Sequence, residues 1–571
     1  MVNQFEVEPV EWRECNERKS YRRVPAPRHH RLLMKMEFVH LPTKSSPDMQ
    51  RRQFWLGAFI VVCLTLAAHV NGLWGQFLQW DDGSHLTQDP TIRALTLANL
   101  RLIFTTFIAK LYIPLTLVSF AVDYQIWGRD PFGYHLINLL FHLANTMLVL
   151  VFVRQILTQV WRPSSAESVA RPESVNLPLQ AAILTAVIFG VHPLRVESVA
   201  WVTERKDMLF AFFFLSGLIA YARWATTSRL ASYWCSLGLF MAAILSKPTA
   251  ITFPFVLLLL DKFVYHRRRL PEKIPFFVGS FLIGILTVAA QASGPGETVV
   301  PTTVIPIWSR VGLIGYCSLF YVRKFFWPFH LTAIYPTFDE MNWQLPQGAA
   351  WLLALVVVCG TIFMLRRLVP LLLPCWLFYL ITLSPTIGLI PAGIHVVADR
   401  FSYLPLIGLA LPVSVGLVSC GRRVWAMAVI VVGVIGLVLL ANTRTAVWRN
   451  TETLFGSVLE EYPKSYPALV NMTVWYTSVG RTDEAIAIGQ RAVAAAPEGL
   501  IGRRNLARAL IKVHRYHEAV VVLRPAIEHG INDFRTWEDL HECFVALGDD
   551  KNARVVQEQM AKTVTASLPT Q

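Results

Sequence analysis

Long apolar runs separated by short polar segments dominate residues 53–441 of the chain. A helix needs roughly 20 consecutive apolar residues to cross a bilayer, and eleven segments approach that length. They lie at 53–73, 134–153, 179–197, 208–224, 231–246, 249–265, 274–291, 348–365, 369–388, 402–419 and 424–441. The pattern therefore predicts an all-α, polytopic membrane bundle with about eleven spans.

Basic residues between these runs predict the orientation of the bundle, because Lys and Arg gather on the cytoplasmic side. Clusters such as Arg366-Arg367 fall at alternate connections, so the N-terminus is expected inside and the C-terminus outside. One more apolar segment, 309–327, contains Arg323-Lys324. If this segment crossed the membrane, Arg366-Arg367 would lie on the extracytoplasmic side, against the rule for basic residues. We therefore expect the segment to be re-entrant or to lie on the outer interface.

Residues 444–571 follow a different, charged and helical pattern. The small residue Ala485 recurs as Ala519 and Ala553, in steps of 34 residues. A 34-residue period with a small residue at a fixed helical position indicates about three tetratricopeptide repeats. We therefore expect a C-terminal α-solenoid with a concave binding face, the alternative being an unrelated helical domain. The same 34-residue spacing separates Gly480, His514 and Gly548.

The chain is thus predicted to have three parts. Residues 1–50 are polar, contain no apolar segment typical of a secretory signal, and are expected to form a disordered cytoplasmic tail. Residues 51–443 form the membrane domain, and residues 444–571 form an extracytoplasmic repeat domain. The localisation that follows is multi-pass, in a bacterial plasma membrane or in the endoplasmic reticulum membrane.

Composition agrees with this class of protein. Hydrophobic residues make up 54% of the chain, charged residues only 16%, and the mean hydropathy is +0.44, whereas soluble domains carry about 25% charge. These values exclude a purely soluble protein and a disordered one. The net charge of +14 is not concentrated in one basic domain, which argues against nucleic-acid binding. The eight cysteines include no CxxC pair. This excludes a fold held together by disulfides and a zinc-ribbon metal site.

The sharpest chemical feature is Asp81-Asp82, an acidic pair that follows the first apolar run. One carboxylate could take the proton of a hydroxyl while its neighbour raises its pKa or orients it. The pair could instead hold a divalent cation, or it could be solvated and cap a short helix. The chain has no Gly-rich phosphate loop, HExxH or Gly-x-Ser-x-Gly motif, which weakens nucleotide-driven transport, metalloproteolysis and serine hydrolysis.

Further polar residues fall on the same predicted side of the membrane. Charges so close to a bilayer are costly, so they usually pair with one another or serve a function. A polar stripe in the second run predicts hydrogen bonds between helices rather than ligand contacts, and it consists of His135, Asn138, His142 and Asn145. The possible site residues outside the acidic pair are His135, His192, Glu197, Asp207 and Asp399.

Several motifs, found in order along residues 55–571, resemble the transmembrane and tetratricopeptide-repeat-containing (TMTC) proteins. The chain departs from that family at Ile113, where many relatives have Arg, and in having only about three repeats. The matching motifs are Trp80-Asp81-Asp82, Tyr112-Ile-Pro-Leu-Thr116, Gly133-Tyr-His-Leu-Ile-Asn138, the stretch from His192-Pro to Asp207, Trp327-Pro328, and Ala398-Asp399-Arg400-Phe-Ser-Tyr-Leu-Pro405.

The resemblance implies a GT-C glycosyltransferase fold, related to protein O-mannosyltransferases, that uses a polyprenyl-phosphate sugar on the extracytoplasmic side. It implies that Asp81 is the base of an inverting displacement at the sugar C1 and that Asp82 orients the acceptor or tunes Asp81. Fixed cations would stabilise the departing lipid phosphate, with Arg400 and Lys247 ranked first. No cofactor is required, although the acidic pair would tolerate a divalent cation. The cation candidates are Arg205, Lys206, Lys247, Arg323, Lys324 and Arg400.

The sugar and the acceptor are less defined. Mannose follows from the family alone, and the acceptor hydroxyl could belong to protein Ser/Thr, to a lipid or to a glycan, with the repeats favouring protein. A noncatalytic scaffold whose repeats bind a partner is the main alternative, but it gives the charges near the bilayer no purpose. A secondary transporter is the third interpretation, but its polar residues would meet at the midplane rather than at one end of the spans.

Overall fold

The computed structural model describes residues 47–161, 177–292, 306–338, 340–341, 343–387, 395–420, 424–528 and 533–567, which belong to one compact unit. These residues form helices and turns and contain no strand beyond an isolated bridge between Ile108 and Leu111. The predicted all-α class is therefore confirmed. The predicted N-terminal tail lies, up to residue 46, outside the described residues.

Each of the eleven predicted apolar runs contains a helix. Among the described residues, seven segments are long and apolar enough to cross a membrane. An eighth is a bent pair, α5 (Leu177–Val191) and α6 (Val196–Ala200), and three more are shorter apolar helices, α8 (Leu230–Ser246), α13 (Leu372–Leu383) and α14 (Leu406–Ser419). The protein is thus a multi-pass membrane protein, while eleven complete crossings stay a prediction. The seven long segments contain α1 (Pro47–His69), α4 (Pro131–Val160), α7 (Arg205–Thr227), α9 (Phe253–Leu260), α10 (Ile274–Ala292), α12 (Leu345–Leu365) and α15 (Val424–Val447).

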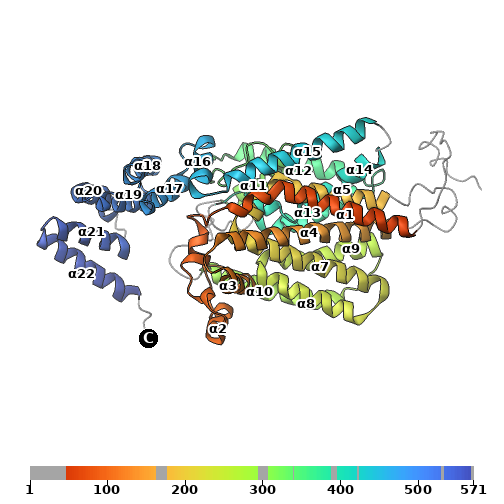
Figure 1. Ribbon diagram of the computed structural model, residues 1–571, viewed down its shortest axis with the longest axis horizontal. Coiled ribbons are helices and arrows are strands. Elements are labelled where there is room, and N and C mark those ends of the chain that lie inside the picture. The colour runs from red at the N-terminus through yellow and green to blue at the C-terminus, as the bar shows by residue number, and fades with distance from the viewer. Residues whose placement is uncertain are drawn as a thin grey trace, which may run out of the picture. The chain divides into compact units, whose positions relative to one another are not determined.

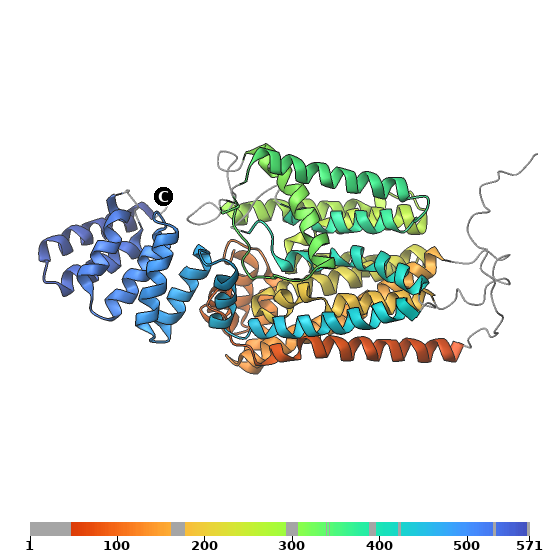
Figure 2. The same ribbon diagram turned by 90° about the horizontal axis from the view of Figure 1, so that it is seen from above.

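These helices lie side by side, and their connections gather at two ends of the bundle (Figures 1 and 2). One end, called the site end here, contains the loop after α1, the bend between α5 and α6, and the turns that precede α9 and α14. The predicted functional motifs are therefore brought to one end. The opposite end, called the basic end, contains the start of α1, the ends of α4, α7 and α12, and the connection between α9 and α10. The basic residues in or next to these segments are Arg51-Arg52, Arg154, Arg223, Arg229, Arg267, Arg268, Arg269 and Arg366-Arg367.

Helix α11 (Ile307–Phe326) corresponds to the apolar segment that was not counted as a span. It crosses the direction of the neighbouring helices steeply (Figure 2). A Cβ added at Gly312, near its start, would lie 2.6 Å from Gly348 at the start of α12. At its other end, the carbonyl of Phe325 is 3.0 Å from His192 Nε2. Both ends of α11 thus lie at the site end, in agreement with a segment that does not cross the bundle.

The break between α5 and α6 arises from local sequence. Pro193 lacks a backbone N–H and cannot continue the hydrogen-bond ladder of α5, and His192 Nδ1 accepts a bond from the Leu194 N–H at 3.2 Å. The two helices meet at 57°. After α6, the short turn η6 (Val202–Glu204) leads into α7. This compact path folds the charged residues between 197 and 207 back on one another.

Polar side chains of α4 connect it to neighbouring helices, as the polar stripe predicted. His142 lies 3.0 Å from the Gly190 carbonyl through Nε2 and 2.7 Å from the Tyr403 hydroxyl through Nδ1. Asn145 donates to the carbonyl of Met208 at 3.0 Å, and Asn138 donates to that of Trp201 at 3.2 Å. These buried bonds fix α4 against the segments that carry the site.

Three helical hairpins follow a short helix, α16 (Thr451–Glu461). Their first helices begin at residues 466, 500 and 534, which confirms the 34-residue period. Ala485, Ala519 and Ala553 are all buried, so each hairpin closes over its small residue. The second residue after each first helix has positive φ, and these residues are Gly480, His514 and Gly548. The hairpins are α17 (Tyr466–Ser478) with α18 (Thr482–Ala495), α19 (Leu500–Lys512) with α20 (Tyr516–Glu528), and α21 (Phe534–Ala546) with α22 (Asp550–Ser567).

Candidate functional site

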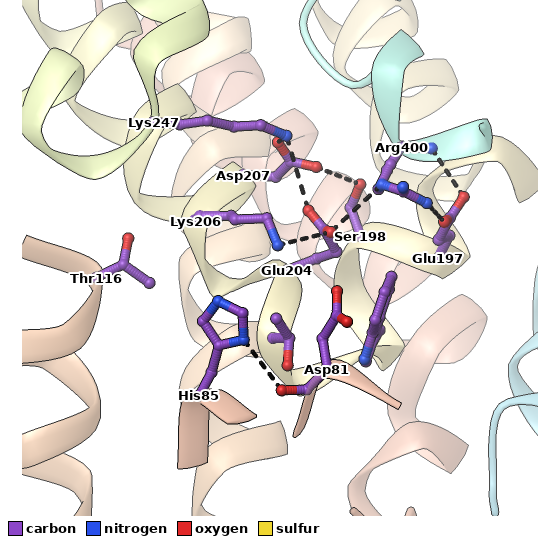
Figure 3. A network of polar contacts seen from close by, with 12 residues as sticks. Asp81, His85, Thr116, Glu197, Ser198, Glu204, Lys206, Asp207, Lys247 and Arg400 are labelled. Carbon is purple, nitrogen blue, oxygen red and sulfur yellow. Dashed lines mark hydrogen bonds and ion pairs between the residues drawn. The ribbon is translucent and has the colours of Figure 1, made fainter. Parts of the chain in front are cut away.

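A network of ion pairs lies at the site end, with Arg400 in turn η11 (Asp399–Ser402) at its centre (Figure 3). The Arg400 guanidinium pairs with one oxygen of Glu197, and the other oxygen accepts a bond from the Arg400 backbone N–H at 3.0 Å. Arg400 Nε also lies 3.3 Å from Glu204 Oε1. All three side chains are buried. Charges interact more strongly here than in water because the surroundings have a low dielectric constant.

Two lysines complete the network. Lys206 Nζ lies 2.9 Å from Glu204 Oε1, and Lys247 Nζ lies 3.7 Å from Glu204 Oε2. Lys247 also pairs with Asp207, whose other oxygen accepts a bond from Ser198 Oγ at 3.2 Å. With Arg400 and Glu197, the network holds three cations and three carboxylates, so its formal charges cancel.

A pocket adjoins the network. Its polar side contains Asp207, Lys247 and Arg400, and its apolar side contains Phe401 and Leu404. Burial alone would lower the pKa of Lys247, but the charges of Asp207 and its neighbour Glu204 raise it above its usual range. The pKa of Arg400 is also raised, because its carboxylate partners outweigh the effect of burial. The pocket therefore offers two fixed positive charges beside an apolar wall.

Asp81 points toward this network from the loop after α1 (Figure 3). Its side chain is half-buried, and within the described part of the chain no hydrogen bond or ion pair is recorded for its carboxylate. Its backbone carbonyl accepts a bond from Ser84 Oγ at 3.1 Å and lies 3.0 Å from His85 Nδ1. The loop is thus held through its backbone, while the carboxylate of Asp81 is left available.

Asp82 has a different environment. It is fully buried, and its carboxyl group accepts bonds from the backbone N–H of Leu78 at 2.8 Å and from the N–H and hydroxyl of Thr203. Burial raises the pKa of Asp82 to about 6, against the opposing effect of these bonds. Asp82 therefore fastens the loop to the turn before α7. A role in holding Asp81 fits this geometry, whereas direct contact with an acceptor does not.

An aromatic stack connects the loop to the ion network. Trp80 stacks on the buried Trp201 with ring centroids 4.3 Å apart and planes at 15°. Arg400 Cζ lies 5.5 Å from the Trp201 ring centroid, and Lys206 Nζ lies 5.7 Å from it. Cations at this distance from a ring face are stabilised by its quadrupole. The arrangement places an unpaired carboxylate beside a network of fixed cations.

Curated relatives of the chain are found among protein O-mannosyl-transferases. Tmtc3 of Drosophila melanogaster is 24% identical over 479 residues, which are 72% of this chain and 51% of that protein. Human TMTC4 is 24% identical over 409 residues, which are 62% of this chain and 54% of that protein. The resemblance to the TMTC family is confirmed. The chain spans about half the length of the curated TMTC relatives it matches.

No model of a protein family matches the chain. Among solved structures, ArnT from Cupriavidus metallidurans bound to undecaprenyl phosphate aligns with a TM-score of 0.37 and 13% sequence identity. That alignment covers 85% of this chain and 81% of ArnT.

Three predicted cations lie outside the network. Arg205 follows Glu204 in sequence but is buried against Asp123, with its Nη2 2.7 Å from Asp123 Oδ2. Lys324 Nζ donates to the carbonyls of Phe329 and His330, at 2.6 and 2.8 Å, and so ties down the turn after α11. Arg323 lies over the Phe320 ring at 5.8 Å. Arg205 and Lys324 thus have structural partners of their own, whereas Arg323 is exposed.

Three other predicted site residues are likewise held apart from the network. His192 stacks on Phe325 with ring centroids 5.4 Å apart. His135 is buried against Gly75, where an added Cβ would lie 2.8 Å from His135 Nε2. Asp399 accepts a bond from the Tyr335 hydroxyl at 2.8 Å, and burial raises its pKa to about 6. Of the possible site residues named from sequence, Glu197 and Asp207 join the network.

Sequence reasoning did not single out Ser198, His85 or Arg195. Ser198 bonds Asp207 from one turn of α6. His85 is buried with its Nδ1 toward the Asp81 carbonyl, and burial lowers its pKa. Arg195 donates to the carbonyl and hydroxyl of Ser402 at 3.0 and 2.8 Å and thereby anchors the Arg400 turn. The position of Arg195 and Ser198 inside the His192-to-Asp207 motif was the available signal.

Proposed function

We propose that the protein is an integral membrane glycosyltransferase that moves a hexose, mannose by its relatives, from a polyprenyl-phosphate carrier to a hydroxyl acceptor on the extracytoplasmic face. A Ser or Thr side chain of a protein is the proposed acceptor. One observation carries the proposal: the unpaired carboxylate of Asp81 points toward the network that fixes Lys247 and Arg400 beside an apolar-walled pocket. The names of the TMTC relatives support it.

The proposed step is an inverting displacement at the sugar C1. The acceptor oxygen attacks C1, its proton passes to the Asp81 carboxylate, and the bond between C1 and the phosphate oxygen breaks. The carrier phosphate leaves with its charge raised from one to two. Lys247 and Arg400 stabilise this growing charge because they are already fixed in place and need no reorganisation. The isoprenoid chain extends along the apolar side of the pocket, past Phe401 and Leu404.

The other residues of the network orient the two cations. Glu197 holds Arg400 at both its side chain and its backbone, and Asp207 holds Lys247. The mechanism requires no metal and no cofactor. The scaffold alternative needs neither the unpaired carboxylate nor the two fixed cations, and for this reason we favour the enzyme.

The test is Asp81→Asn, assayed with purified protein, radiolabelled polyprenyl-phosphate sugars and a peptide acceptor. We expect transfer to fall at least 100-fold, a typical contribution of a positioned general base, while insertion and thermal stability stay unchanged because the carboxylate has no recorded partner to lose. Thr87→Val is the matched control, since Thr87 lies in the same loop and its hydroxyl contacts only the Gly83 carbonyl, at 3.5 Å. Wild-type turnover by Asp81→Asn would remove the base assignment, and binding of a partner by the repeats without any transfer by the wild type would favour the scaffold.

A further inference from the structure

The loop that carries Asp81 is held by the segment that follows the last apolar helix. This segment, residues 448–455 and called the junction here, comprises the link after α15 and the start of α16, which leads to the repeats. The backbone N–H of Gln76 donates to the carbonyl of Arg449 at 2.8 Å. The N–H of Gln79 donates to the Thr451 hydroxyl at 2.9 Å, and Thr451 is buried. Residues separated by 372 positions in sequence thus share hydrogen bonds.

Aromatic contacts add to these bonds. The Phe455 ring, fully buried, meets Trp80 with ring centroids 5.6 Å apart. Trp80 also stacks on Trp201, with ring centroids 4.3 Å apart. Trp448 in turn packs on Trp201 at 5.9 Å. Trp80 is therefore held between the junction and the ion network, and the next residue in the chain is Asp81.

The fixed points bracket Asp81 closely. On its N-terminal side, Gln79 and Trp80 are held by the junction, and on its C-terminal side Asp82 is held by Thr203. A carboxylate between two fixed neighbours keeps its position even though it has no partner of its own. A misplacement of about 1 Å in such a group can cost about 100-fold in rate, so the junction is placed where it controls the chemistry.

We propose that Thr451 and Phe455 are positioning residues for sugar transfer, so that the first helix beyond the bundle sets the geometry of the catalytic loop. This inference rests on the proposed function. It also gives the repeats a route to the reaction, because α17 follows α16 directly and packs against it. A polypeptide bound to the repeats would act on Asp81 through the same two side chains.

The variant Thr451→Val keeps the shape of the side chain and removes the acceptor of the Gln79 N–H. We expect kcat to fall about 10-fold while the KM for a polyprenyl-phosphate sugar stays within about twofold, because the pocket with Lys247 and Arg400 is untouched. Thr451→Ser restores the hydroxyl and should restore kcat. The matched control is Ser457→Ala, since the Ser457 hydroxyl lies in the same helix beyond the junction and donates only to the Leu454 carbonyl, at 2.7 Å.

Hydrogen exchange of the 76–82 segment supplies a readout that does not depend on activity. In the wild type the Gln79 amide should be protected, and Thr451→Val should increase its exchange while Ser457→Ala should not. Equal kcat losses in Thr451→Val and Ser457→Ala, or unchanged exchange in Thr451→Val, would overturn the inference. If the wild type transfers no sugar from any carrier, the proposed function fails, and the exchange result alone then decides whether the junction holds the loop.

Discussion

Replacing Arg400 by Met tests how the ion network is balanced. Arg400 is the only cation recorded in contact with Glu197 among the described residues, whereas Glu204 also contacts Lys206 and Lys247. Arg400→Met therefore leaves Glu197 as a buried charge with one remaining bond, from the backbone N–H of residue 400. Removing one partner of a buried pair costs about 3–5 kcal/mol. Because that backbone bond survives, we expect a loss of about 3 kcal/mol.

A second substitution separates stability from chemistry. Glu197→Gln in the Arg400→Met background removes the uncompensated charge, so the double variant should regain most of the lost stability. Sugar transfer should not return, because the fixed cation beside the pocket is still missing. Lys206→Met is the matched control and should cost much less, since Glu204 keeps Lys247 and Arg400.

The measurement is the free energy of unfolding in mixed micelles titrated with SDS, together with transfer from a radiolabelled carrier. Equal stability of Arg400→Met and the wild type would refute the reasoning, because it would mean that Glu197 does not depend on Arg400. The reasoning would also be refuted if the stability losses caused by Arg400→Met and Glu197→Gln simply added in the double variant. Recovery of transfer by the double variant would remove Arg400 from the phosphate site while leaving the account of stability intact.

Two further predictions concern pH and metals. The pKa of Asp82 is about 6 in the folded protein against 3.8 as its ordinary value, so the stability that its protonated form contributes is present below about pH 4 and is lost as the pH rises through about 6. Asp82→Asn should remove that slope from thermal unfolding in detergent, and an unchanged slope would contradict the assignment. Chelation with EDTA should leave transfer unchanged, because no group of three His, Cys, Asp or Glu side chains is placed to hold a metal within the described residues; a loss that Mn²⁺ reverses would argue for a metal.

The helices and the repeats could be predicted because their signals are local. An apolar run of about 20 residues has few alternatives to a membrane helix, and a 34-residue period fixes a hairpin by itself. The alternation of basic residues between the apolar runs predicted that the functional motifs share one side of the membrane. In the structure, these motifs lie at one end of the bundle. The steep course of α11 also agreed with its three charged residues, which a span would have exposed to lipid.

The roles of neighbouring charges could not be predicted in the same way. Glu204, Arg205 and Lys206 are consecutive, yet each step along a helix turns the side chain by about 100°. Arg205 consequently faces Asp123, while Lys206 faces the network. Asp81 and Asp82 differ for the same reason, one unpaired and the other bonded to Thr203. The partner of Glu197 lies 203 residues away, a distance over which a single sequence carries no pairing signal.

The opposite placement of the two ends of the bundle has a consequence for biogenesis. Helix α1 begins at the basic end, and α15 finishes at the site end, just before the hairpins. A bilayer around the bundle separates these two ends into different compartments. With the proposed orientation, the hairpins are translocated before they fold. The contacts of Thr451 and Phe455 with the loop that bears the carboxylate then form only after the last apolar helix has been made.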